Sequence, residues 1–170
     1  MTAASPSRPL ITPLRSANDA LLALNNNDAA QLSLLSLPEL DQLIRESFYS
    51  AAIAGSDALL IAFDQSSRYE SVNLLWFRAH FENNPDKKFV YVDRIVVAPA
   101  ARGKGYARAL YTNLFQRAKS AGHTRIVCEV NLDPPNPISD AFHASLNFSE
   151  VGHASIHNGA KTVCYLLHSL

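Results

Sequence analysis

Residues 96–107 have the sequence VVAPAARGKGYA and join a predicted strand, 89–97, to a predicted helix, 105–121. The strand is rich in Val, Tyr and Phe, which pack well in a pleated sheet. Two glycines in the connecting turn allow the main chain to approach a ligand closely. The helix after them directs unpaired N–H groups and the positive end of its dipole toward the same space. The segment therefore predicts a binding site for a pyrophosphate group.

Two other phosphate-binding loops fit these residues less well. A Walker A loop requires Gly-x-x-x-x-Gly-Lys-Ser/Thr, but Ala98 stands five places before Gly103, and Gly105 follows Lys104. A dinucleotide fingerprint requires a small residue at the position that Arg108 occupies. The first loop is therefore excluded, and the second is a weak match.

Hydrophobic periodicity predicts the elements on both sides of this segment. Further strands are expected at 10–14, 51–54, 58–63, 125–132, 151–156 and 162–167. Further helices are expected at 20–24, 36–48, 72–79 and 139–146, with a loop at the asparagines 25–27 and a hairpin turn at 158–159. The order β-α-α-β-β-α-β-α-β-α-β-β predicts a mixed α/β (α+β) fold. Its twisted sheet of six to seven strands is flanked by helices, with parallel crossovers in the middle and antiparallel hairpins at both sides.

The length and composition of the chain suit one globular domain. Its 170 residues, 48% of them hydrophobic, are enough to bury a core. We expect a flexible tail over residues 1–9 and a single domain over residues 10–170. Fifteen basic residues balance fifteen acidic ones, so the net charge favours neither nucleic acid nor an anionic membrane as a partner. No stretch approaches the roughly eighteen apolar residues that a membrane helix requires.

Cys128 and Cys164 are the two cysteines of the chain, and both fall in apolar runs. Buried, reduced thiols are typical of a cytoplasmic protein, which is the location that we expect. A disulfide between them is the alternative if their strands are neighbours. Two isolated cysteines offer no metal framework, so no metal site is expected. The N-terminal residues also lack the apolar core of a secretory signal.

Two elements resemble one known family. Arg102, Gly105 and Ala107 match the pattern Arg/Gln-x-x-Gly-x-Gly/Ala, by which the GNAT superfamily of acyl-CoA N-acyltransferases binds acetyl-CoA. Residues 136–148, NPISDAFHASLNF, are similar to a second element of that family, which ends Phe-Tyr-x-x-x-Gly-Phe. His143 replaces the usual Tyr of this element, and Asn147 replaces the Gly, which Asn tolerates because it adopts the left-handed conformation more readily than other side chains. The resemblance is strongest over residues 91–148.

The resemblance implies a GNAT-like sheet in which two central parallel strands splay apart and hold the acyl thioester between them. Main-chain groups of the first strand would bond the pantetheine arm and the thioester oxygen. Acetyl-CoA is the implied cosubstrate. The residues expected to bind it are Ile95, Val96, Val97, Arg102, Gly103, Lys104, Gly105, Tyr106, Ala107, Arg108, Asn136 and His143.

Acylation of an amine by a thioester requires a base, because the amine must be neutral to attack. Asp93 and Glu129 are the candidates, since both are acidic residues inside otherwise apolar strands. Each also has a structural interpretation, for Asp93 an ion pair with an arginine such as Arg78 or Arg125, and for Glu129 a hydrogen-bond network. His143 is the candidate acid for the departing thiolate, or else it only packs or caps its helix.

The expected function is therefore acetyl-CoA-dependent N-acetylation of a primary amine, by direct attack on the thioester. The acceptor is expected to be a small molecule rather than a protein, with neither nucleic acid nor a membrane as partner, and a homodimer is possible. The alternative is a catalytically weak module that binds or senses acyl-CoA. The resemblance places the acceptor pocket near Tyr69, Asn73, Trp76, Phe77 and Arg78, although Trp76 and Phe77 also suit the core.

Overall fold

The computed structural model describes residues 9–28 and 32–170, and seven strands form one sheet in this part of the chain. The strands are β1 (Ile11–Pro13), β2 (Tyr49–Ile53), β3 (Ala58–Asp64), β4 (Val90–Val97), β5 (Arg125–Asp133), β6 (Ser149–Ile156) and β7 (Lys161–Ser169). The helices are α1 (Asp19–Asn26), α2 (Leu37–Glu46), α3 (Val72–His80), the short 3₁₀ helix η1 (Pro99–Ala101), α4 (Tyr106–Ser120) and α5 (Pro137–Ala144). The predicted element order and mixed fold class are confirmed.

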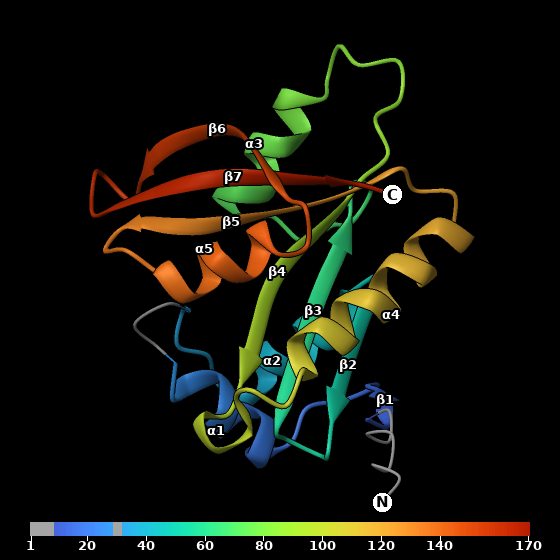
Figure 1. The fold of residues 1–170 in the computed structure, drawn as a ribbon, viewed down its shortest axis with the longest axis vertical. Coiled ribbons are helices and arrows are strands. Elements are labelled where there is room, and N and C mark those ends of the chain that lie inside the picture. The colour runs from blue at the N-terminus through green and yellow to red at the C-terminus, as the bar shows by residue number, and fades with distance from the viewer. Residues whose placement is uncertain (1–8, 29–31) are drawn as a thin grey trace, which may run out of the picture.

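The sheet has the order β1-β2-β3-β4-β5-β7-β6, and only its central pair is parallel within the described residues. Strands β4 and β5 pair at Val90↔Ile126 and Tyr91↔Val127, at the start of both strands. Figure 1 shows the two strands diverging from this shared end. The predicted splay of the central strands is therefore present, and it opens a gap along the rest of β4.

A β-bulge shapes the part of β4 that faces this gap. Ile61 pairs with Arg94 and Ala62 with Val92, so Asp93 is an extra residue on β4. A bulge bends its strand and redirects the side chains around it. The side chains of the consecutive residues Asp93 and Arg94 form an ion pair at this bulge, beside the gap.

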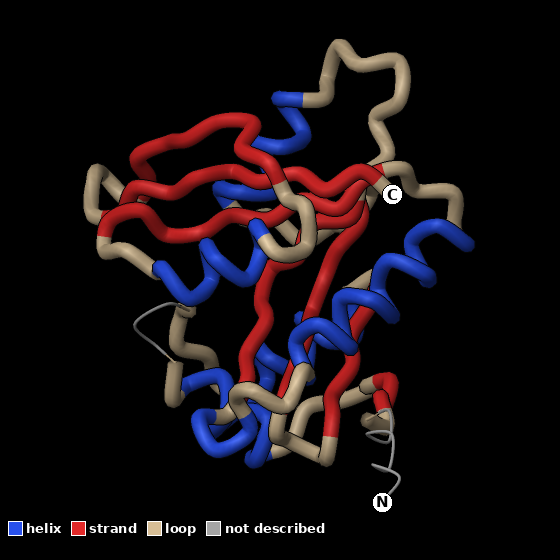
Figure 2. The backbone as a smooth tube through the Cα atoms, viewed as in Figure 1, coloured by secondary structure: helices blue, strands red, loops and turns tan. Residues whose placement is uncertain are grey.

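Helices cover both faces of the sheet (Figures 1 and 2). One hydrophobic cluster packs α1, α2 and α3 against one face, and Leu21, Leu40 and Phe77 are fully buried in it. A second cluster packs α4 against the other face through Leu110 and Leu114, as the predicted stripe requires. The gap between β4 and β5 therefore lies between two hydrophobic clusters, one beneath α1, α2 and α3 and the other beneath α4.

Several predicted boundaries differ from the observed ones. The asparagine run is not a loop, because α1 continues through Asn26 and Asn25 is completely buried. Helix α2 ends at Glu46, so Phe48 lies outside it and packs edge-on against His123. Asn147 has a φ of 60°, the left-handed conformation expected after the helix at this position. Residues 1–8 of the predicted tail lie outside the described residues.

Gly152 on β6 lies directly against the Trp76 ring of α3. A Cβ at this position would be 2.6 Å from Cζ2 of Trp76, well inside contact distance. We predict that Gly152→Ala lowers the free energy of unfolding by about 1–3 kcal/mol, because the indole must move out of its stack on Tyr165. Denaturant unfolding measures this loss. Adding Trp76→Phe should recover part of it, and a fully additive double variant would contradict the steric explanation.

Candidate active site

A cavity of about 660 Å³ occupies the gap between β4 and β5. Its walls come from both strands, from the turn before α4 and the start of that helix, from α5, and from the segment after α1. The lining residues that carry polar or reactive side chains are Asp28, Asp93, Arg94, Arg102, Tyr106, Arg108, Tyr111, Cys128, Glu129, Asn131, Asn136, Ser139 and His143. The cavity therefore combines a helix start, several cations and two candidate bases.

The glycines of the turn adopt backbone conformations that other residues resist. Gly103 has a φ of 76° and Gly105 a φ of 77°, and a Cβ on either would meet open space. Gly105 is the N-cap of α4 and offers no side chain to the first N–H groups of the helix. Those groups and the helix dipole are therefore available to an anion in the cavity.

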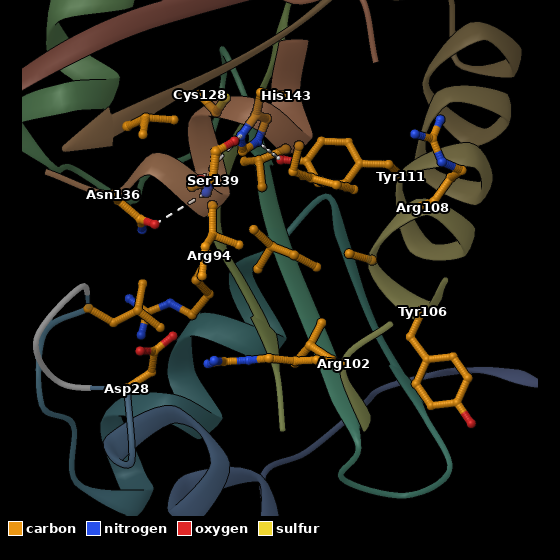
Figure 3. A pocket seen from close by; sticks show the side chains of 18 of the residues that line it. Asp28, Arg94, Arg102, Tyr106, Arg108, Tyr111, Cys128, Asn136, Ser139 and His143 are labelled. Carbon is orange, nitrogen blue, oxygen red and sulfur yellow. Dashed lines mark hydrogen bonds between the residues drawn. The ribbon is translucent and has the colours of Figure 1, made fainter. Parts of the chain in front are cut away.

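The three cations expected near this turn lie in different places. Arg102 lines the cavity, and Figure 3 shows its side chain extending across toward Asp28. Arg108 also lines the cavity, but its guanidinium donates a hydrogen bond to Ser145 Oγ at 2.8 Å. Lys104 is not among the lining residues and places its Nζ 5.9 Å from the centroid of the Tyr106 ring. Arg102 is therefore the cation best placed for a ligand.

Most of the other residues predicted to bind the cofactor line the same cavity. These are Ile95, Val97, Gly103, Gly105, Tyr106, Ala107, Asn136 and His143. The side chain of Val96 instead belongs to the hydrophobic cluster beneath α1, α2 and α3. On that residue only main-chain atoms are left to serve a ligand. The side chain of Asn136 accepts from the Ser139 N–H and caps α5 (Figure 3).

His143 is buried, and both of its ring nitrogens have partners. Nδ1 lies 2.8 Å from the carbonyl oxygen of Ser139, which can only accept, so Nδ1 carries the hydrogen. Nε2 lies 2.7 Å from the hydroxyl of Tyr111, which reaches it from α4 (Figure 3). Burial lowers the pKa of His143, so the ring is neutral near pH 7 and Nε2 accepts the Tyr111 hydrogen.

Glu129 lies on the face of the sheet that α3 covers, opposite to the face that holds His143 and Tyr111. Its Oε1 accepts from the Tyr91 hydroxyl at 3.2 Å, while its Oε2 is enclosed and has no hydrogen-bond partner among the described residues. Burial, together with the charge of Asp93, raises the pKa of Glu129 to about 8, although the Tyr91 hydroxyl and the Asn73 amide oppose this rise. A carboxyl group with this pKa can accept a proton near neutral pH.

Asp93 is held in a buried ion pair. Arg94 contacts its Oδ2 through both Nε and Nη2 at 2.7 Å, and the Tyr69 hydroxyl donates to its Oδ1 at 2.8 Å. Arg94 also donates to the buried Asn25 of α1 at 2.8 Å. Both carboxylate oxygens of Asp93 are thus occupied. Its partner is the adjacent arginine and not Arg78 or Arg125.

Comparison with known proteins identifies the family. The sequence model of the acetyltransferase (GNAT) family matches residues 57–148, more than half of the chain. The chain belongs to this family. No curated protein matches its sequence. The GNAT match spans β3 to α5 and therefore contains both strands of the splayed pair and the glycine turn.

Solved structures share the GNAT fold at low sequence identity. NAA60 from Arabidopsis thaliana in complex with acetyl-CoA has a TM-score of 0.67 at 15% identity, over 95% of this chain and 98% of that chain. The NatC complex bound to Gag peptide and CoA has a TM-score of 0.64 at 15% identity, over 95% and 98%. An IAA acetyltransferase from Bacillus cereus has a TM-score of 0.61 at 15% identity, over 95% and 99%. One of these structures contains a bound Gag peptide and another protein is named for IAA, so the shared fold does not identify the acceptor of this GNAT protein.

The residues expected to form the acceptor pocket of the GNAT domain lie behind the cavity wall. Tyr69 stacks on Phe63 and bonds Asp93, while Asn73 accepts from the Tyr165 hydroxyl at 3.0 Å. Trp76 stacks on Tyr165, and Phe77 is part of the core. Arg78 donates to the carbonyl groups of Gln65 and Ser67. None of these five residues lines the cavity, and Tyr69 is connected to it through its hydrogen bond to Asp93.

The sequence did not single out Tyr111, Arg94, Asp28, Cys128 or Ser139 as residues of this GNAT cavity. Tyr111 gave the clearest available signal. It lies on the buried face of its helix between Leu110 and Leu114, where a hydroxyl needs a partner. The other four gave no comparable local signal, because long-range contacts determine whether they reach the cavity.

Two smaller findings concern the cysteines and membrane helices. Cys128 and Cys164 lie on neighbouring strands, but Cys164 pairs opposite Val130, and both thiols are free. Among residues 9–28 and 32–170, no helix has the length and apolar character needed to cross a membrane.

The contribution of the buried Asp93–Arg94 ion pair to stability can be tested by substitution. We predict that Arg94→Met lowers the free energy of unfolding by about 3–5 kcal/mol, because it leaves the Asp93 carboxylate buried beside Glu129 without its cation. Arg45→Met is the matched control, since Arg45 is 67% exposed in its pair with Asp41 and should cost less than about 1 kcal/mol. Equal losses in the two variants would contradict this role of Arg94.

Proposed function

We propose that the protein transfers the acetyl group of acetyl-CoA to a primary amine. The observation that carries this proposal is the open cavity between β4 and β5, which is bordered by the glycine turn and by the start of α4, where no side chain caps the first N–H groups. The pyrophosphate of CoA would lie against Gly103, Gly105 and Arg102, and the pantetheine arm along Ile95 and Val97. Carbon–sulfur cleavage would then occur where the strands separate, within reach of residues from both faces of the sheet.

Glu129 is the proposed general base. Glu129 lines the cavity, its Oε2 makes no hydrogen bond among the described residues, and its raised pKa suits a group that takes the proton of the attacking amine near neutral pH. Asp93 is not the proposed base, because both of its oxygens are engaged and Arg94 balances its charge. Asp28 places a carboxyl group at the cavity wall. Glu129 takes one proton from the bound ammonium group, the neutral amine attacks the thioester carbon, and the sulfur keeps the electron pair of the broken bond. The second proton, which the nitrogen loses as the amide forms, passes to water.

A panel of acceptors tests this function. Purified protein is incubated with radiolabelled acetyl-CoA and either small amines, among them polyamines, amino acids and aminoglycosides, or peptides with a free N-terminus. We expect labelled amide from small amines, in line with a small-molecule acceptor, and preferential labelling of peptides would replace that part of the proposal. Absence of transfer to every acceptor would contradict the enzyme assignment.

A module that binds or senses acyl-CoA is the second candidate. The observation in its favour is that both ring nitrogens of His143, the expected acid, are engaged by Tyr111 and Ser139. Tight binding of CoA without transfer to any acceptor in the panel would support this candidate. A cytoplasmic location, a single domain over residues 10–170 and a homodimer stay predictions of both proposals.

A further inference from the structure

Tyr111 and His143 form a buried pair on the α4 side of the cavity. Tyr111 is completely buried in the core beneath α4, and His143 is 2% exposed at the end of α5. Both line the same cavity as Ile95 and Val97 of β4, along which the proposed function places the pantetheine arm of CoA. The pair therefore borders the cavity in which the proposed function places the CoA thioester.

The hydrogen positions in this pair are fixed by its surroundings. Nδ1 of His143 lies 2.8 Å from the Ser139 carbonyl oxygen, which can only accept, and 3.2 Å from the Ser139 hydroxyl, which can donate or accept. We assign the hydrogen to Nδ1 on the shorter contact, which leaves Nε2 of the neutral ring as an acceptor. The hydrogen of the 2.7 Å contact therefore belongs to the Tyr111 hydroxyl. The hydroxyl is a donor that can rotate about its C–O bond, whereas the ring has no second hydrogen to give.

Resting on the proposed function, we infer that Tyr111 and not His143 donates the hydrogen bond that stabilises the departing CoA thiolate. When the carbon–sulfur bond breaks, the Tyr111 O–H turns from Nε2 of His143 to the sulfur, and no proton is transferred in this step. The turn is favourable because a hydrogen bond to a charged acceptor is stronger than one to a neutral ring nitrogen. The thiolate takes its proton from water after the transfer.

One further observation agrees with this role. Burial, with contributions from Cys128 and Glu129, keeps the pKa of Tyr111 well above 10, so the hydroxyl retains its hydrogen at every working pH. His143 is then a positioning residue, which directs the hydroxyl through its fixed tautomer. An amide oxygen at position 143 can accept the same hydrogen bond, whereas an aliphatic side chain cannot.

The ionisation of bound CoA tests the inference without any acceptor. The thiolate is followed by ultraviolet absorbance across a pH series, with the complex of desulfo-CoA subtracted to remove the signal of the protein. We expect Tyr111→Phe to raise the pKa of the bound thiol by about one to two, while the affinity for CoA changes less than about threefold. Tyr49→Phe is the matched control, because the Tyr49 hydroxyl bonds Asn113 of the same helix outside the cavity.

Substitutions at position 143 distinguish the donor role of Tyr111 from the positioning role of His143. We expect His143→Leu to raise the pKa of the bound thiol and His143→Gln to restore much of the change, with neither having a further effect once Tyr111 is Phe. In turnover, Tyr111→Phe should lower kcat about tenfold to a hundredfold, with little change in KM for acetyl-CoA. An unchanged thiol pKa in Tyr111→Phe would overturn the inference while the proposed function stands. If the wild-type protein bound no CoA, both would fall.

Discussion

Gly105→Glu is expected to weaken the binding of CoA at least about a hundredfold. The glutamate side chain would sit at a φ of 77°, which costs an L-residue about 1–2 kcal/mol. Its carboxylate would also lie at the start of α4, where the pyrophosphate of CoA is proposed to bind, and would repel it. Backbone strain is the same with and without CoA and therefore lowers stability, so the loss of affinity comes from the repulsion. Each 1.4 kcal/mol corresponds to about a tenfold change in affinity, so a repulsion of about 3 kcal/mol gives the expected magnitude. Isothermal titration calorimetry with CoA measures the loss.

The opposite end of the same helix provides the control for this variant. Gly122 follows α4 with a φ of 79°, so Gly122→Glu introduces the same side chain and a similar backbone strain far from the cavity. We expect Gly122→Glu to reduce stability to a similar degree and to leave CoA affinity within about threefold of the wild type. If the two variants lost affinity equally, the glycine turn would not be the binding site.

Glu129→Gln is expected to lower kcat by about a hundredfold to ten-thousandfold, the usual effect of removing a general base. Glutamine preserves the size of the side chain and can still accept from the Tyr91 hydroxyl, but it cannot take a proton from the amine. CoA affinity should be nearly unchanged, because the proposed phosphate site lies at the start of α4. A variant that kept most of its kcat at saturating substrate would show that another group, or water alone, removes the proton.

The pH dependence of the wild-type protein follows from the same residue. Since a general base must be ionised, kcat/KM should rise with pH up to about 8, the pKa of buried Glu129. Stability should change in the opposite sense. Between a pH of 4.5, the ordinary pKa of the group, and about 8, the folded protein retains a proton that the unfolded chain releases, so the free energy of unfolding falls as the pH rises. Glu129→Gln should remove both trends.

Much of the fold and the conformation of the glycine turn could be predicted because their signals are local. The glycines of 96–107, the stripe of α4 and the turn at 158–159 each specify their conformation within a few residues. The splay of strands β4 and β5 could also be predicted, through the family resemblance that Arg102 and Gly105 carry.

The rest of the site depends on contacts between distant residues. Asn25 looked like part of a loop, yet it is buried because it accepts a hydrogen bond from Arg94, 69 positions away. The bulge at Asp93 arises from pairing with β3, and no residue of β4 alone indicates it. His143 likewise meets Tyr111 from another helix. Sequence patterns can suggest candidate residues, but these pairings determine which atoms are free to act.

The central claim is that the turn before α4 binds the pyrophosphate of CoA. Calorimetric titration of the wild-type protein with CoA, and in parallel with pantetheine, tests it most directly, because pantetheine has the thiol arm but no phosphate. The account predicts saturable binding of CoA in the micromolar range, about −8 kcal/mol, and binding of pantetheine at least about a hundredfold weaker. No heat with millimolar CoA, or equal affinity for the two ligands, would contradict it.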